Sequence, residues 1–379
     1  MSDTNPNLIQ EEDNNNPSAG AGAVPLVLIH DGGGTVFSYH LLGPLNRALY
    51  GIWNPCYYVP PRGRSRNWES IPEMAEHYIT LITKTLPFPR DGGRGRRRVI
   101  LGGWSLGGLL SLEIAHQIAT QSEKDIGVDV LGIVMVDSIC PLSYQKNHGG
   151  GRMEEEGGYS PISAQQQQQQ PSSKDSTLED GQNGAEGMNS KNVRVVQHAM
   201  EWSPHTRPET REAVTRCFSE AGRMVSQWKL PPQWADDNNS NEQTTRTVNG
   251  QRKNYYPGWS RSTTTTTTTD RNGREEGLLL QPPPPPPVIL LRCAEPVPVV
   301  VPPVAEDGDD VVAVSRVDLD RRDPLLGWGR YRPDLITRVE ELPGVHHFNI
   351  FTTAERLDIV TEKIKRACFK IESMAAKSS

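Results

Sequence analysis

A serine between two glycines is the part of this sequence best suited to covalent chemistry. Residues 103–107 read Gly-Trp-Ser-Leu-Gly, a G-x-S-x-G pattern. An apolar run at 99–101 precedes it and a helical pattern at 109–120 follows it. In this strand–turn–helix context the pattern forms a nucleophile elbow, which exposes a serine Oγ at the N-terminus of a helix. The sequence therefore predicts Ser105 as a nucleophile.

A second glycine cluster follows the first apolar run of the chain. After residues 24–29 the sequence reads His-Asp-Gly-Gly-Gly at 30–34. In serine hydrolases built this way, an amide of this early loop and the amide after the nucleophile hold the oxyanion. We expect the amides of Gly32 and Leu106 to do so. A phosphate-binding loop is a poor alternative, because the third glycine and the Lys-Ser/Thr pair are missing.

A nucleophilic serine needs a base and an acid, and in this fold they follow it in the order acid, then base. His346 and His347 follow the last predicted strand, so either can be the base. Asp137 and Glu295 each follow a predicted strand and would lie at the carboxyl edge of the sheet, where sites form. The unbroken apolar run before Asp137 favours it, whereas prolines at 296 and 298 suggest that Glu295 lies on a departing strand.

The elements that must position these residues alternate between strand and helix. Continuous apolar runs predict buried strands at 24–29, 99–101, 130–136 and 288–293. A further strand is expected at 335–342. Helices are expected after Ser70, which has capping-box spacing to Glu73, and at 109–120 and 353–371. This alternation predicts an α/β fold, with one mostly parallel sheet and helices on both faces.

The chain divides into four segments that differ in composition. Residues 1–22 are polar and predicted to be disordered, and 23–140 form the first part of the core. Residues 141–287 form an insertion with Gln, Thr and Pro runs, in which a helical module at 193–228 is joined by disordered tracts. Residues 288–372 complete the core.

Composition excludes several classes of protein. The chain has 379 residues and a net charge of −6, which argues against a nucleic-acid partner. It has no apolar run long enough to span a membrane and no secretory leader. The five cysteines include no C-x-x-C pair, which predicts no disulfide scaffold or zinc site. We expect a cytoplasmic protein without a cofactor.

Three motifs together carry a family resemblance. Gly-Gly-Trp-Ser-Leu-Gly-Gly at 102–108, Val-Asp-Ser at 136–138 and Gly-Val-His-His-Phe at 344–348 resemble a thioesterase domain of the α/β-hydrolase superfamily. The resemblance is to the releasing thioesterases of nonribosomal peptide and polyketide synthases, particularly fungal ones. It implies Asp137 as the acid, His347 as the base, and a lid formed by the insertion 141–287.

The resemblance also implies a reaction and a partner. Ser105 would take an acyl, polyketide or peptidyl chain from the phosphopantetheine thioester of a carrier protein, in secondary-metabolite biosynthesis. Two alternatives remain: a carboxylic-ester hydrolase or lipase with the same triad, and an inactive module that only binds carrier proteins. A basic cluster at Arg94, Arg96, Arg97 and Arg98 is expected to be a solvated loop, with a docking patch for an acidic carrier protein as the alternative.

Overall fold

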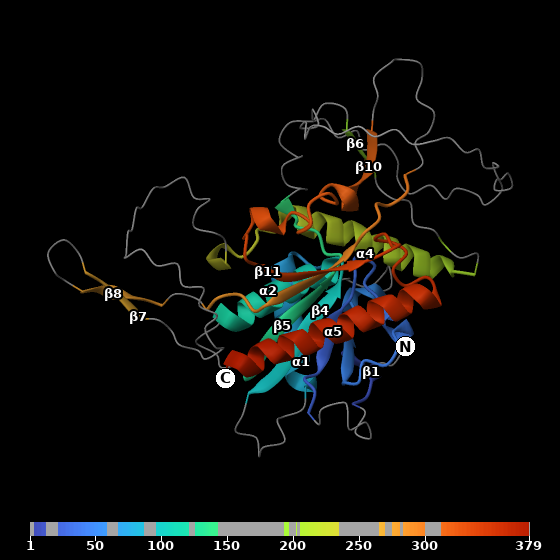
Figure 1. Cartoon of the computed structure of the whole chain (residues 1–379). Coiled ribbons are helices and arrows are strands. Elements are labelled where there is room, and N and C mark those ends of the chain that lie inside the picture. The colour runs from blue at the N-terminus through green and yellow to red at the C-terminus, as the bar shows by residue number, and fades with distance from the viewer. Residues whose placement is uncertain are drawn as a thin grey trace, which may run out of the picture.

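The computed structural model describes twelve stretches of the chain. They are residues 4–12, 22–58, 67–86, 96–120, 126–142, 193–196, 202, 205–234, 265–269, 275–280, 283–299 and 312–378. Most of the described residues belong to one α/β unit built around a central sheet (Figure 1).

The central sheet has seven strands in the order β1-β3-β2-β4-β5-β9-β11. Its strands are β1 (Asn7–Gln10), β2 (Leu26–Ile29), β3 (Leu49–Ile52), β4 (Arg97–Trp104), β5 (Val128–Val136), β9 (Val288–Cys293) and β11 (Ile336–Leu342). All neighbours are parallel except β1 and β3. The expected mostly parallel sheet is confirmed.

Each face of this sheet packs against helices. Along β2, Leu26 and Leu28 belong to one apolar cluster and Val27 and Ile29 to the other, as the alternation of side chains in a strand requires. Helices α1 (Ile71–Thr85) and α2 (Leu106–Thr120) cover the Ile29 face, and α5 (Ala354–Ser378) covers the Leu28 face.

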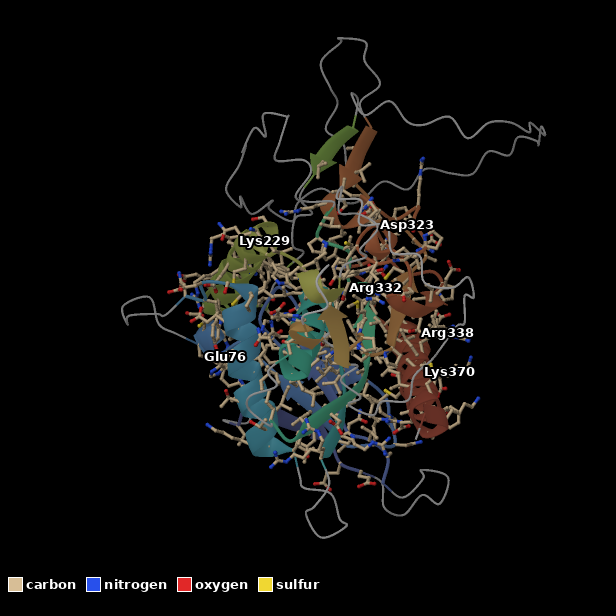
Figure 2. The ribbon with its side chains drawn as sticks, turned by 90° about the vertical axis from the view of Figure 1, so that its left-hand side faces the viewer. Glu76, Lys229, Asp323, Arg332, Arg338 and Lys370 are labelled. Atoms are coloured by element: carbon tan, nitrogen blue, oxygen red, sulfur yellow. The ribbon has the colours of Figure 1, made fainter. Side chains whose placement is uncertain are left out.

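The two figures show this layering. In Figure 1, α5 runs across the front of the sheet and α4 (Pro208–Gln227) lies across one end of it. Figure 2 shows Glu76 of α1 and Lys229, just after α4, on one side of the molecule, and Arg338 of β11 and Lys370 of α5 on the other.

The predicted start of α1 is confirmed. The Oγ atom of Ser70 accepts a hydrogen bond from the amide of Glu73 at 3.3 Å, and a proline occupies the first turn, where its missing N–H costs nothing. One face of α1 buries Met74, Ala75, Tyr78 and Ile82 in the core, as their helical spacing predicts.

The insertion differs from its prediction in two places. The helix-like stretch contains α4, but its beginning, β6 (Val193–Val196), is a strand paired in parallel with β10 (Val312–Ser315). Part of the threonine run is also a strand, since β7 (Thr265–Thr269) pairs with β8 (Glu275–Leu280). Threonine and valine are branched at Cβ and favour extended backbone, which composition-based reasoning overlooked. The Gln run and the rest of the tracts lie outside the described residues.

The prediction that residues 1–22 are disordered is wrong for residues 7–10. Strand β1 pairs with β3 at the edge of the sheet, and the Gln10 side chain binds the carbonyls of Leu42 and Gly43 and the amide of Leu45. Four residues are too few for a visible pattern, so backbone and amide hydrogen bonds fix the strand without an apolar run.

The described helices include none that is both long and apolar enough to cross a membrane. Four cysteines, Cys140, Cys217, Cys293 and Cys368, are buried free thiols.

Candidate active site

Three side chains from separate elements meet at the carboxyl edge of the sheet. Ser105 follows β4, Asp137 follows β5, and His347 lies in the loop between β11 and α5. Nε2 of His347 lies 3.1 Å from Oγ of Ser105, and Nδ1 lies 2.8 Å from Oδ2 of Asp137. Since the carboxylate can only accept, Nδ1 carries the proton and Nε2 is left to accept from the serine hydroxyl. The arrangement has the connectivity of a serine-hydrolase triad.

The elbow around Ser105 is strained and tightly packed. Ser105 has a φ of 55°, in the left-handed region that side chains avoid. A Cβ on Gly103 would lie 2.6 Å from the carbonyl oxygen of Ile29, and one on Gly107 would lie 2.3 Å from the same oxygen. Only glycine therefore lets the elbow approach the end of β2 this closely, which explains the G-x-S-x-G spacing.

A tyrosine hydroxyl joins the elbow to the loop that follows β2. Oη of Tyr39 donates to the carbonyl of Ile29 at 2.7 Å and accepts from the amide of Trp104 at 2.9 Å. The Trp104 ring in turn lies 5.5 Å from the His347 ring, centroid to centroid. Tyr39 therefore ties the ends of β2 and β4 together beside the serine.

The glycine loop lies under the insertion helix α4. A Cβ on Gly32 would lie 2.7 Å from the ring of Phe218. One on Gly33 would lie 3.3 Å from Val214, and one on Gly34 would lie 2.9 Å from Sγ of Cys217. Within the described part of the chain, the amides of Gly32 and Leu106 donate no hydrogen bond to a protein acceptor. Both amides remain free to bind an oxyanion.

His30, at the start of this loop, is not part of the triad. Its ring is buried, with Nε2 2.6 Å from Oη of Tyr78 and Nδ1 2.6 Å from the carbonyl oxygen of Asp31. Burial lowers the pKa of His30 to about 4, outweighing the hydrogen bond to Asp31. His30 is therefore a neutral structural residue at neutral pH.

Arg321 is the residue near the site that sequence reasoning missed. It lies 184 positions after Asp137, yet its guanidinium binds both carboxylate oxygens, at 2.6 and 2.8 Å. Burial would raise the pKa of Asp137, but hydrogen bonds from Arg321 and His347 outweigh it and hold the pKa well below its usual range. The segment around Arg321 has no motif that marks it as part of a site, so nothing in the sequence signals the pairing.

The other candidates from the sequence are placed elsewhere. Glu295 is exposed, and His346 binds the amide of Phe348 through Nδ1 while His347 reaches the serine. Arg96 and Arg98 lie at the amino end of β4, opposite the elbow, where Arg96 pairs with Asp129. Arg94 lies outside the described residues.

No group of three or more His, Cys, Asp or Glu side chains in the described ranges is arranged to hold a metal ion.

Comparisons with known proteins point to one family. A model of the thioesterase domain matches residues 24–276, more than half of the chain. The match ends before β9, so His347 lies outside it.

A probable thioesterase, gloN, of Glarea lozoyensis is 28% identical over 97% of this chain and 98% of its own length. Thioesterase frbE of a Dothideomycetidae species is 42% identical over 38% of this chain and 51% of its own length. Among solved structures, the NocB thioesterase domain from the nocardicin cluster is 19% identical, with a TM-score of 0.43 over 93% of this chain and 95% of that one.

Proposed function

The chain belongs to the thioesterase family, and from that premise we propose that it releases an acyl, polyketide or peptidyl chain from a carrier-protein thioester through a serine acyl-enzyme. The observation that carries the proposal is the continuous chain of contacts from Ser105 through His347 to Asp137. Relatives named as thioesterases from several fungi support the class of reaction.

The proposed chemistry follows from the contacts. His347 takes the proton of Ser105 as Oγ attacks the thioester carbonyl, and Asp137 stabilises the imidazolium that forms. The amides of Gly32 and Leu106 bind the oxyanion. The C–S bond then breaks, the thiol leaves with the proton from His347, and an ester to Ser105 remains. Water, or a nucleophile within the acyl chain, attacks that ester through the same base.

The segment at 141–287 is the proposed lid. Its helix α4 packs on the glycine loop through Val214, Cys217 and Phe218. Because the glycine loop is proposed to bind the oxyanion, a helix packed on it would border the bound substrate, and its side chains would contact the acyl chain. The buried cysteines Cys140, Cys217, Cys293 and Cys368 are free thiols, which fits the proposed cytoplasmic location of the reaction.

The experiment that tests the proposal compares sulfur and oxygen esters of one acyl group. Acyl-pantetheine thioesters and the matching oxygen esters are given to the wild-type protein and to Ser105→Ala, and kcat/KM is measured for each. The proposal predicts a preference for the thioester that Ser105→Ala abolishes. Equal or faster turnover of the oxygen ester would instead identify a carboxylic-ester hydrolase.

A further inference from the structure

The carboxylate of Asp137 is held from four directions. Oδ1 accepts from the amide of Cys293 at 2.9 Å and from Nη1 of Arg321 at 2.6 Å. Oδ2 accepts from Nη2 of Arg321 at 2.8 Å and from Nδ1 of His347 at 2.8 Å. Three of the four donors are independent of the histidine. The plane of the carboxylate is therefore set before His347 binds it.

Arg321 is itself fully engaged. An arginine has five N–H donors, and all five have acceptors here. Besides the two bonds to Asp137, Nη1 donates to the carbonyl of Cys293 at 3.1 Å and Nη2 to that of Val317 at 3.3 Å. Nε donates to Oδ1 of Asp318 at 2.8 Å. A planar guanidinium held in this way cannot turn, so it clamps the carboxylate it binds.

A cation bound to the acid of a triad weakens the acid's effect on catalysis. Asp137 assists by stabilising the imidazolium of His347, and a positive charge bound to both of its oxygens cancels much of that effect. Asp318 offsets the cost, because it pairs with Arg321 and is itself buried, with 3% of its side chain exposed. Its second oxygen accepts from the amide of Val297 at 2.6 Å. Asp137, Arg321 and Asp318 together carry a single negative charge, as an unpaired aspartate would.

We propose that Arg321 and Asp318 are positioning residues of the active site: Arg321 fixes the carboxylate of Asp137, and Asp318 restores the negative charge that the imidazolium of His347 requires. This inference rests on the proposed function, because it assigns the two residues to the triad chemistry. It makes the acid a three-residue unit assembled from the end of β5, from η7 (Arg316–Asp318) and from the turn that follows η7.

The surrounding groups leave this charge balance intact. Burial raises the pKa of Cys293 well above its ordinary value, so its thiol is neutral. Arg292 donates to the carbonyl of Arg321 and pairs with Glu341, and Asp320 pairs with Arg330. In the sequence, Arg316 and Arg322 flank the segment that carries Asp318 and Arg321, and His346 precedes His347. Within the described residues, Asp137 and Asp318 have no ion-pair partner besides Arg321 and His347.

The test uses the pH dependence of covalent labelling of Ser105 by a fluorophosphonate, with three variants. Asp318→Asn keeps the shape and one acceptor oxygen, but removes the charge and the second acceptor. Asp320→Asn is the matched control, since it removes a buried carboxylate two residues away that pairs with Arg330. Arg321→Lys keeps the charge and removes the planar fork. The midpoint of thermal unfolding shows that each variant is folded.

The pH dependence of labelling is expected to change in Asp318→Asn and to stay unchanged in Asp320→Asn. With Asp318→Asn the site loses one negative charge, so protonation of the site becomes harder and the acidic limb of the labelling profile moves to lower pH by about one unit. The rate on the plateau falls by up to about tenfold, because the imidazolium is less stabilised. Asp320→Asn leaves both unchanged. Arg321→Lys lowers kcat for thioester cleavage by about ten- to a hundredfold, with KM and the acidic limb unchanged.

Three results would overturn the inference. An acidic limb that stays in place in Asp318→Asn, or moves as far in Asp320→Asn, would show that Asp318 has only a structural role. A kcat in Arg321→Lys equal to that of the wild-type protein would show that the planar guanidinium does not position Asp137. A wild-type protein that is not labelled at all would contradict the proposed function, and this inference with it, before any variant is compared.

Discussion

Asp137 and Glu295 both follow buried strands at the carboxyl edge of the sheet, and only Asp137 contacts His347. Its Oδ2 lies 2.8 Å from Nδ1, whereas the side chain of Glu295 is exposed. From residue pattern alone the two remained alternatives, because a strand end fixes where a side chain starts but not where it points. The contact now favours Asp137.

The first prediction separates these two carboxylates. Asp137→Asn should keep the packing but favour the wrong tautomer of His347, lowering kcat by about 10⁴. Glu295→Gln is the matched control and should change kcat by less than about tenfold. Steady-state kinetics on an acyl-pantetheine thioester measures both. A larger loss in Glu295→Gln, with both variants folded, would move the acid to Glu295.

His30 supplies a second prediction, for the pH dependence of stability. Its pKa is about 4 when folded and about 6.5 when unfolded, so the unfolded chain binds the proton first as the pH falls. Stability from neutral His30 is therefore complete above about pH 6.5 and is lost towards pH 4, by about 3 kcal/mol.

His30→Gln, which cannot titrate, isolates this loss. Urea unfolding at pH 7 and pH 4 should show that the wild-type protein loses about 3 kcal/mol more free energy of unfolding than the variant does. Other titrating groups contribute equally to both proteins and cancel. Parallel losses in the two proteins would mean that His30 is protonated in the fold.

At the scale of elements, the contact between α4 and the glycine loop decides what borders the site. A Cβ on Gly32 would lie 2.7 Å from the Phe218 ring, so the helix and the loop touch without a gap. The sequence indicated a helical insertion and a glycine loop separately. It could not show that they meet. Apolar helix positions and glycine-rich loops also occur in proteins where the two elements lie far apart.

The third prediction is a double-mutant cycle across this contact. Gly32→Ala should destabilise the fold by about 1–3 kcal/mol, because the methyl group meets the ring. With Phe218→Ala in the same chain the space is open, and the combined loss should be smaller than the sum by at least about 0.5 kcal/mol. Chemical unfolding of the four proteins measures the coupling. Strict additivity would show that α4 does not pack on this loop.

The strands show which elements a sequence pattern can predict and which it cannot. Runs such as those of β5 and β9 were predicted almost to the residue, because a strand buried on both faces has to be continuously apolar. The edge strand β1 and the short β3 were not predicted. Both strands have only four residues, which is too few to show a periodic signal, and backbone pairing with neighbouring strands holds them in the sheet.

At the scale of the whole molecule, the site is assembled from residues far apart in the chain. His347 lies 242 positions from Ser105, and Arg321 lies 184 from Asp137. Motifs revealed Ser105 and the family resemblance singled out His347, because both sit in recognisable local patterns. Arg321 and Asp318 lie in no such pattern. Their role depends on how the turn after β10 folds against the end of β5, which only three-dimensional structure shows.

The geometry also bears on where a carrier protein docks, and gives the fourth prediction. The basic residues before the elbow lie at the amino end of β4, about 25 Å of extended chain from Ser105. Arg98→Glu should therefore leave KM within about twofold for both a carrier-bound thioester and a soluble acyl-pantetheine at low salt. A rise in KM for the carrier-bound substrate alone would instead show that this basic cluster is a docking patch for the carrier protein.

The central claim is that Ser105 carries the acyl chain, and peptide mapping after a rapid quench tests it most directly. The wild-type protein is mixed with an acyl-pantetheine thioester, quenched in acid within its first turnovers, digested and analysed by mass spectrometry, with Ser105→Ala treated identically. We predict one acyl group on the peptide containing Ser105 and none anywhere in Ser105→Ala, whose hydrolysis rate falls by several orders of magnitude. An acyl group on another residue, or unchanged thioester cleavage by Ser105→Ala, would contradict the account.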